Sequence, residues 1–225
     1  MAILTFAIPT MGLTSPSSWG SRDAIKNQIN TIWSKYGNYF KFASVQSGLN
    51  VKILVAFCAV ESGGNPIAGG STSPTQGLMQ FNKNYVKEQL KNEFKSGRLS
   101  DAEKQKLASY GFKFDSEGNT RDFTQADLVK PELNILVGSI ILSQLADQPW
   151  ARINGQLRLD RIIVVYNAGL YGKWGKIATQ QPNTSPLDLH NKLEGNRVSQ
   201  SYLSKMMGKN GALDIATSDL NSLIA

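Results

Sequence analysis

The sequence predicts a mainly α-helical protein with about seven helices and at most one small β-hairpin. Apolar residues recur at helical spacing in several separate segments, and a glycine follows most of them, as is typical where helices end. Only residues 113–123 show strand-like alternation on either side of a turn cluster. The chain of 225 residues is 41% hydrophobic and 18% charged, which is typical of a folded globular protein.

The first half of the chain contains the helix that matters most for function. An amphipathic helix begins after Ser21, which can cap it, and its apolar face carries Ile25, Ile29, Ile32, Trp33 and Tyr36. The next helix, over residues 51–62, is apolar nearly all round and is expected to be buried on most sides, with Glu61 in its last turn. Residues 62–77 are rich in glycine and serine and predict a loop, after which residues 82–94 resume a helical pattern.

The second half is expected to be helical apart from the hairpin. Ser100–Glu103 matches a capping box, and Pro131 stands at the start of a long core helix. A further apolar helix ends at Gly169, and two more, within residues 185–195 and 196–211, are each closed by glycine.

We expect one main domain over residues 21–208, preceded by an arm over 1–20 and followed by a weakly patterned tail over 209–225. No apolar run approaches the roughly 20 residues needed to cross a bilayer, so no membrane span is expected. The first basic residue is Arg22, so the charged start of a secretory signal is also missing.

The formal net charge of +7 indicates an anionic partner, such as nucleic acid, an anionic envelope polymer or a phospholipid surface. The lysines are scattered and interleaved with acidic residues, without a dense basic arm or a recognisable nucleic-acid module. We therefore expect no nucleic-acid partner and attribute most lysines to a solvated surface.

Two other kinds of site are rejected on the residues. Cys58 lies inside an apolar helical run without a basic neighbour that would favour its thiolate, so a nucleophilic pair with the single histidine, His190, is not expected. The segment beginning at Asp115 has oxygen ligands at alternating positions but lacks the glycine and the final glutamate of a calcium loop. The sequence predicts neither a metal nor another cofactor.

Glu61 stands where the apolar run breaks into glycine, serine and proline. A carboxyl group beside Phe57 and Val60 loses solvation in its charged form, so we expect its pKa to rise. Such a group can donate a proton to a departing sugar oxygen, as general acid catalysis of glycosidic cleavage requires. The alternative is a solvated glutamate at a helix end, which is the common situation of this residue type.

Four motifs occur around and after this residue: ESGGNP from Glu61, GLMQF from Gly77, KPELNILVG from Lys130 and YNAG from Tyr166. In this order they resemble the motif set of the soluble lytic transglycosylase family, relatives of goose-type lysozyme. They cover residues 61–169, about half of the chain. The resemblance implies a lysozyme-like fold and cleavage of the bond between N-acetylmuramic acid and N-acetylglucosamine in peptidoglycan.

By position in these motifs, Glu61 resembles the family's single catalytic acid/base, and Tyr166 resembles the tyrosine that faces it. Met79 and Gln80 resemble the sugar-contacting pair on the floor of the cleft. Ser62 and Asn167 complete the expected substrate-binding residues, together with a serine near the acid. For Met79 plain packing is the alternative, and for Asn167 it is a cap on its helix end.

The other matched positions are less specific. Asn134 and Gly138 match positions that we interpret as structural. The stretch before GLMQ is one residue longer than the common pattern, so the serine near the acid is either Ser71 or Ser73, and we favour Ser71.

The resemblance implies a reaction with one carboxyl group. No second Asp or Glu lies between Glu61 and Gln80, and goose-type lysozymes place an aspartate where this chain has Asn82, whose amide cannot activate a water. Glu61 would protonate the glycosidic oxygen and then take the proton of the muramic acid 6-hydroxyl, which closes onto the anomeric carbon and gives a 1,6-anhydro sugar. The Tyr166 hydroxyl is expected to orient Glu61 or the acetamido group of the substrate.

Other functions stay open at this point. A muramidase could hydrolyse the same bond with a distant carboxylate such as Glu88 or Asp127, and a structural or glycan-binding protein could keep the fold without turnover. Peptidoglycan strands are the expected partner. Because no export signal is evident, we expect a phage virion protein of the tail or capsid that acts on the host cell wall, with other virion proteins as partners. A released endolysin and an exported bacterial enzyme are the alternatives.

Overall fold

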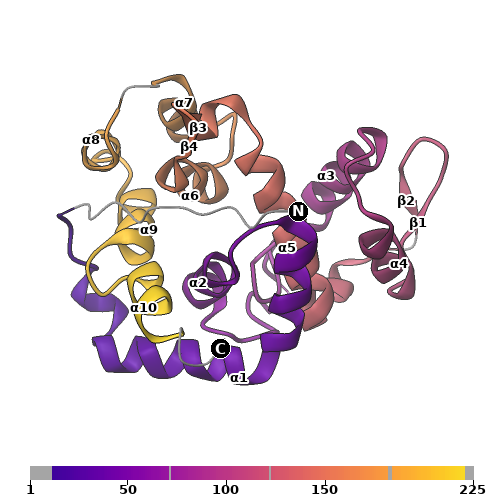
Figure 1. Ribbon diagram of the computed structural model, residues 1–225, viewed down its shortest axis with the longest axis horizontal. Helices are drawn as coiled ribbons and strands as arrows, with labels where there is room; N and C mark the ends of the chain where they lie inside the picture. The colour runs from indigo at the N-terminus through magenta and orange to yellow at the C-terminus, as the bar shows by residue number, and fades with distance from the viewer. Residues whose placement is uncertain (1–11, 71, 122, 182–183, 221–225) are drawn as a thin grey trace. The chain divides into compact units, whose positions relative to one another are not determined.

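The computed structural model describes residues 12–220 except 71, 122, 182 and 183, and these residues are mainly helical (Figure 1). Their contacts divide the chain into two compact units. One is formed by residues 31–143 and the other by residues 12–30 together with 144–220. None of the described helices combines the length and the apolarity that a membrane crossing requires.

The first unit contains most of α1 (Arg22–Ser47) and α5 (Pro131–Ala146), whose remaining residues belong to the second unit. Between them in the chain lie α2 (Val51–Ser62), α3 (Lys83–Lys95), α4 (Asp101–Ser109) and the short η2 (Gln125–Val129). An antiparallel hairpin pairs β1 (Lys113–Phe114) with β2 (Thr120–Arg121), with Phe114 opposite Thr120.

The starts of these helices follow from local side-chain chemistry. Asn50 Oδ1 accepts the Lys52 N–H (3.0 Å) at the start of α2. Ser100 and Glu103 form the predicted capping box of α4, with bonds of 2.7 and 3.2 Å. The core of the unit comes from α2 and α5, because residues 53–59 and 133–142 are buried without interruption.

The predicted hairpin is present between α4 and η2. The ring of Phe114 stacks on Phe94 of α3, with 4.8 Å between the ring centroids. Asp115 Oδ1 accepts the backbone N–H groups of Glu117 (2.9 Å) and Asn119 (2.8 Å), which fixes the turn. The carboxylate that begins the rejected calcium loop therefore holds this hairpin together.

The second unit combines the two ends of the described chain. It contains η1 (Ser17–Trp19), the first part of α1, η3 (Pro149–Ala151), the pair β3 (Arg152–Ile153) and β4 (Gln156–Leu157), and the helices α6 (Leu159–Ala168), α7 (Lys173–Gln180), α8 (Pro186–Lys192), α9 (Arg197–Met207) and α10 (Ala212–Asp219). α6 packs against α7 and α9, and α9 packs against α10. The Ser15 N–H donates to the Lys209 carbonyl oxygen (3.1 Å), so the N-terminal arm pairs with the C-terminal segment.

The prediction of about seven helices is too low, because the described residues contain ten α-helices. The sequence pattern does not predict α7, which contains a glycine. The helix forms because Gly175 lets the backbone approach the end of α6: a Cβ there would lie 1.9 Å from the Gly169 carbonyl oxygen. α10 lies in the expected tail and buries Leu213 and Ile215. The β3–β4 pair is present in addition to the expected hairpin.

The two units divide the chain at other positions than the predicted limits of arm, domain and tail. The described part of the arm and residues 209–220 belong to the same unit as α6–α9. The limits after residues 20 and 208 stay a prediction.

Candidate active site

Glu61 lies in the last turn of α2, as the sequence predicts. Residues 53–59 before it are buried, whereas Glu61 itself is partly exposed. Gly63 ends the helix in the left-handed conformation (φ 64°), and its N–H donates to the Ala59 carbonyl oxygen at 3.1 Å. A closely packed core helix therefore brings one carboxyl group to the border of the solvent.

The residues that follow Glu61 close α2 against α1. Gly64 has a φ of 82°, and a Cβ at this position would lie 2.5 Å from Ile32 Cγ1 on α1. The Ser62 hydroxyl donates to the Cys58 carbonyl oxygen and accepts the Gly64 N–H, each at 3.1 Å. The ESGG sequence is therefore explained by the tight end of the helix, and the predicted contact of Ser62 with substrate stays a prediction.

Cys58 lies one turn before Glu61, and its Sγ is 4.0 Å from Ser62 Oγ. Burial raises the pKa of the Cys58 thiol to about 12; the hydrogen bond with Ser62 opposes this rise, and the nearby Glu61 adds to it. The thiol is therefore protonated at neutral pH and serves packing rather than nucleophilic chemistry.

The GLMQF motif forms a tight loop closed by paired backbone. Gln76 and Phe81 exchange two backbone hydrogen bonds of 3.1 Å each. Gly77 has a φ of 89°, and a Cβ there would lie 2.1 Å from the Leu128 carbonyl oxygen. Only glycine fits this position without moving the neighbouring backbone.

Gln80 holds the loop onto the chain before it. Its Nε2 donates to the carbonyl oxygens of Ala68 (2.9 Å) and Gly77 (2.8 Å), and its Oε1 accepts the Thr75 hydroxyl (3.2 Å). These bonds stabilise an unfavourable backbone, since Gln80 is a non-glycine residue at a φ of 52°. The side chain thus has a structural role, and its predicted contact with a sugar stays a prediction.

Asn134 on α5 is fully buried and fixes the same loop. Its Oδ1 accepts the Met79 N–H (2.7 Å), and its Nδ2 donates to the carbonyl oxygens of Gln76 (3.2 Å) and Leu128 (2.9 Å). The Met79 side chain is buried against Gly138, where a Cβ would lie 2.2 Å from Met79 Sδ. The interpretation of Asn134 and Gly138 as structural residues is confirmed.

Met79 has no exposed surface. The buried side chain fits the packing interpretation, and the predicted contact with a sugar stays a prediction. Ser71, the favoured serine near the acid, lies outside the described residues. Ser73 Oγ accepts the Thr75 N–H (3.2 Å), so the other candidate serine organises the loop before Gln76.

Tyr166 and Asn167 lie in the last turn of α6 in the second unit, and both are partly exposed. The helix ends at Gly169, whose N–H donates to the Val165 carbonyl oxygen at 2.8 Å. Asn167 Oδ1 accepts the Ser199 hydroxyl (2.8 Å), so the side chain is bonded to α9. The assisting role of Tyr166 and the substrate contact of Asn167 stay predictions.

The sequence patterns did not single out Ser199 or Thr75, which hold two of the motifs. Ser199 comes three residues after Asn196, whose Oδ1 accepts the Ser199 N–H (3.3 Å) at the start of α9. This spacing indicates a helix cap. No local pattern could have revealed that Ser199 also binds Asn167, which lies 32 residues earlier.

The other carboxyl groups considered for a hydrolytic reaction have structural surroundings. Glu88 is exposed on α3. Asp127 Oδ2 accepts the N–H and the hydroxyl of Thr124 (2.8 Å each), and Oδ1 pairs with Lys130 Nζ (2.7 Å). Burial acts to raise the pKa of Asp127, but the hydrogen bonds from Lys130 and Thr124 outweigh it and lower the pKa. Asn82, at the position of the goose-type aspartate, caps α3 by accepting the Asn84 N–H (2.8 Å).

Comparison with known proteins gives one family. Residues 38–109, about a third of the chain, match the family model described as Transglycosylase SLT domain. The matched part includes Glu61 and the whole GLMQF loop, and it ends before α5 and α6. No curated protein gives a significant match. The matched region supports a relation of this chain to the SLT, lysozyme-like transglycosylases, which act on peptidoglycan.

Proposed function

We propose that the protein is a peptidoglycan lytic transglycosylase in which Glu61 is the single acid/base. The observation that carries the proposal is that Glu61 lies inside the matched SLT region and has no other acidic residue near it in the sequence. Glu61 is the only Asp or Glu in the sequence from residue 24 to residue 87. A reaction that needs two neighbouring carboxylates therefore finds no second one in this part of the chain.

The position of Glu61 suits a proton donor. It stands at the C-terminal end of α2, where the partial negative charge of the last carbonyl groups disfavours a carboxylate, and the last turn contains no basic residue. The buried segment over residues 53–59 reduces solvation on one side of it, which acts in the same direction. Both effects favour the protonated carboxyl group that a general acid requires.

In the proposed reaction, the Glu61 carboxyl group gives its proton to the oxygen between N-acetylmuramic acid and N-acetylglucosamine as the bond to the anomeric carbon breaks. The acetamido group of the substrate stabilises the positive anomeric carbon. The Glu61 carboxylate then takes the proton from the 6-hydroxyl of the same muramic acid, whose oxygen bonds to the anomeric carbon. The attacking group belongs to the substrate, so the step needs positioning rather than a second carboxylate or a water.

Mass spectrometry of the fragments released from purified peptidoglycan tests this proposal. The wild-type protein should release products lighter by one water than their hydrolytic counterparts, and Glu61→Gln should release none. Glu88→Gln is the matched control, because it makes the same chemical change at an exposed position and should leave the products unchanged. Ordinary reducing ends would instead support the muramidase. The absence of products from the wild-type protein would support a structural or binding role.

Tyr166→Phe tests the assisting hydroxyl in the same assay. Loss of a group that orients the acid or the acetamido group should slow the release of anhydro products by about 10-fold to 100-fold. The association with a phage particle stays a prediction, which mass spectrometry of purified particles would test.

A further inference from the structure

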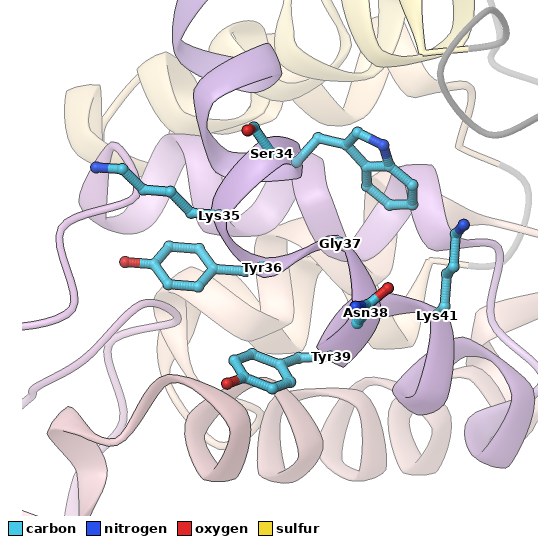
Figure 2. A pocket seen from close by; sticks show the side chains of 8 residues that line it. Ser34, Lys35, Tyr36, Gly37, Asn38, Tyr39 and Lys41 are labelled. Atoms are coloured by element: carbon cyan, nitrogen blue, oxygen red, sulfur yellow. The ribbon is translucent and has the colours of Figure 1, made fainter.

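The part of α1 from Trp33 to Lys41 borders a pocket of about 300 Å³ (Figure 2). We call it the α1 pocket; it lies wholly within the first unit. Its volume is at the lower end of the range of about 300–1,000 Å³ that is typical of small-molecule sites. The lining combines the aromatic rings of Trp33, Tyr36 and Tyr39 with the ammonium groups of Lys35 and Lys41.

Gly37 in this lining is a poor residue for the middle of a 26-residue helix, since glycine weakens a helix relative to alanine. Its presence has a packing reason. A Cβ at position 37 would lie 3.3 Å from two atoms of the Trp33 indole, which is a tighter contact than usual. The indole therefore occupies the space beside Gly37.

The two tyrosines offer surfaces that suit a sugar. Tyr36 and Tyr39 are partly exposed and extend from the same side of α1 (Figure 2), as their spacing of three residues requires. A tyrosine ring supplies an apolar face for the C–H groups of a sugar, and its hydroxyl can donate or accept a hydrogen bond. The exposed Asn38 amide adds further donors and an acceptor to the lining.

The α1 pocket lies beside α2, the helix that carries Glu61. A Cβ at Gly64, just after the end of α2, would lie 2.5 Å from Ile32 Cγ1, one turn before Tyr36 on α1, so the two helices approach each other there. Burial raises the pKa of Tyr36, and the Cys58 thiol and the Tyr39 hydroxyl add to the rise. Cys58 stands one turn before Glu61 on α2. A ligand bound at Tyr36 is therefore close to the C-terminal part of this helix.

The charges of the lining favour an anionic ligand. Lys35 and Lys41 are exposed and occur in a stretch, residues 24–60, that contains no Asp or Glu. Lys35 extends from the same side of α1 as the two tyrosines, whereas Lys41 extends from the other side (Figure 2). There its Nζ lies 5.6 Å from the centroid of the Trp33 ring. Peptidoglycan offers both required chemistries, because its sugars carry short peptides with carboxylate groups.

We infer that the α1 pocket binds a peptide-bearing sugar of a peptidoglycan strand. Tyr36 and Tyr39 contact the sugar, and Lys35, which extends from the same side of α1, pairs with a carboxylate of its peptide (Figure 2). This inference deepens the proposed function and rests on it, because it takes the substrate to be peptidoglycan.

Binding to the inactive Glu61→Gln protein tests the inference without turnover. The probes are soluble glycan strands that carry their peptides and the same strands after an amidase has removed the peptides. Lys35→Ala should weaken binding of the peptide-bearing strands by about threefold, as expected for the loss of one exposed ion pair. Binding of the peptide-free strands should not change. Lys113→Ala, which removes the same charge at another exposed position of the first unit, is the matched control.

Tyr39→Ala should weaken binding of both probes by about fivefold, whereas Tyr39→Phe, which keeps the ring, should retain most of the binding. Thermal unfolding of each variant checks that it is folded, and the lysine variant changes only an exposed side chain. Unchanged binding in the lysine and tyrosine variants, an equal loss with peptide-free strands in the lysine variant, or no binding by the Glu61→Gln protein itself would overturn the inference. Failure of the proposed function has a different signature, since the wild-type protein would then release no anhydro products.

Discussion

The GLMQF loop and the start of α6 each lead to a motif of the candidate site, but they are fixed by different chemistry. The loop is held by the neutral amide of Asn134, which bonds three backbone groups. The start of α6 is held by ions: Arg158 binds Asp160 through two bonds of 2.8 and 2.7 Å, and both side chains are largely buried.

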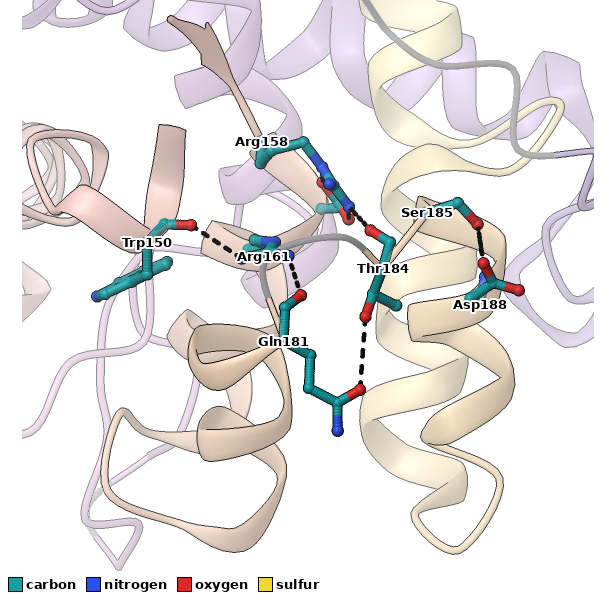
Figure 3. Close-up of polar contacts among 8 residues, drawn as sticks. Trp150, Arg158, Arg161, Gln181, Thr184, Ser185 and Asp188 are labelled. Carbon is teal, nitrogen blue, oxygen red and sulfur yellow. Dashed lines mark hydrogen bonds and ion pairs between the residues drawn. The ribbon is translucent and has the colours of Figure 1, made fainter. Parts of the chain in front are cut away.

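The ionic cluster extends from α6 to the segment before α8. Arg158 also donates to the Thr184 carbonyl oxygen (2.6 Å) (Figure 3). Arg161, which is 1% exposed, donates to the carbonyl oxygens of Trp150 (3.1 Å) and Gln181. Burial lowers the pKa of Arg161, and the neighbouring Arg158 adds to this effect.

Because of this difference, the two segments should lose different amounts of stability when one of their bonded side chains is removed. A neutral amide loses less solvation free energy than an ion when it leaves water, and its bonds do not depend on ionic strength. Buried ions lose more solvation, so the cluster at α6 is favourable only while each charge keeps its partner. Removal of one ion should therefore be more damaging than removal of the amide.

Asp160→Ala is the largest change that we expect. It leaves the Arg158 cation without its buried partner and should lower the free energy of unfolding by about 3–5 kcal/mol. Urea unfolding measures the loss. Asp101→Ala is the control, because Asp101 pairs with Lys104 on the surface and its loss should cost less than about 1 kcal/mol. Equal losses in the two variants would contradict the role of the buried pair.

Asn134→Ala should follow, with a loss of about 3 kcal/mol, because it leaves one N–H and two carbonyl groups without their buried partner. Unlike the loss in Asp160→Ala, this loss should be the same at low and high salt. Asn65→Ala, which removes a single exposed bond to the Ile67 N–H, is the matched control. A strong salt dependence of the Asn134→Ala loss would contradict the contrast between neutral and ionic attachment.

The local parts of these arrangements could be predicted from the sequence. The capping box at Ser100, the first-turn position of Pro131 and the place of Glu61 at the end of a buried helix are all as predicted. Each depends on residues within four positions of one another. The family resemblance of the region around Glu61 is supported by the SLT match.

The parts that depend on distant residues could not be predicted. The motif around Met79 predicts a contact with a sugar. Only the position of Gly138, 59 residues later, shows that the Met79 side chain is buried. The backbone of α7 approaches Gly169 closely at Gly175, and the sequence of α7 alone does not indicate this contact. The hydrogen bond from Ser199 to Asn167 likewise joins two segments, and the sequence pattern of neither segment indicates the other as its partner.

Ser199→Ala sharpens the comparison at the other end of α6. It removes the hydroxyl that donates a hydrogen bond to Asn167 Oδ1 and should lower the free energy of unfolding by about 1 kcal/mol. If Asn167 contacts substrate, the variant should also raise KM more than it lowers kcat, and Ser199→Thr, which keeps the hydroxyl, should restore the wild-type values. A loss of stability with unchanged KM would limit Ser199 to a structural role.

Glu132 gives the smallest expected effect and brings both kinds of chemistry onto one helix, two residues before Asn134. Its carboxylate accepts the Tyr110 hydroxyl and pairs with Lys106 Nζ at 2.8 Å. Burial acts to raise the pKa of Glu132, but the bonds from Lys106 and Tyr110 outweigh it and hold the pKa below its ordinary value of 4.5. The carboxylate therefore contributes stability that is fully present above pH 4.5 and is lost as the pH falls through the lower pKa of the folded state.

Glu132→Gln should be less stable than the wild-type protein near neutral pH, and urea unfolding at decreasing pH should show the difference shrinking below pH 4.5. The cost of Asn134→Ala should stay constant over the same range, because the amide does not titrate. A constant difference for Glu132→Gln would show that its charge contributes nothing.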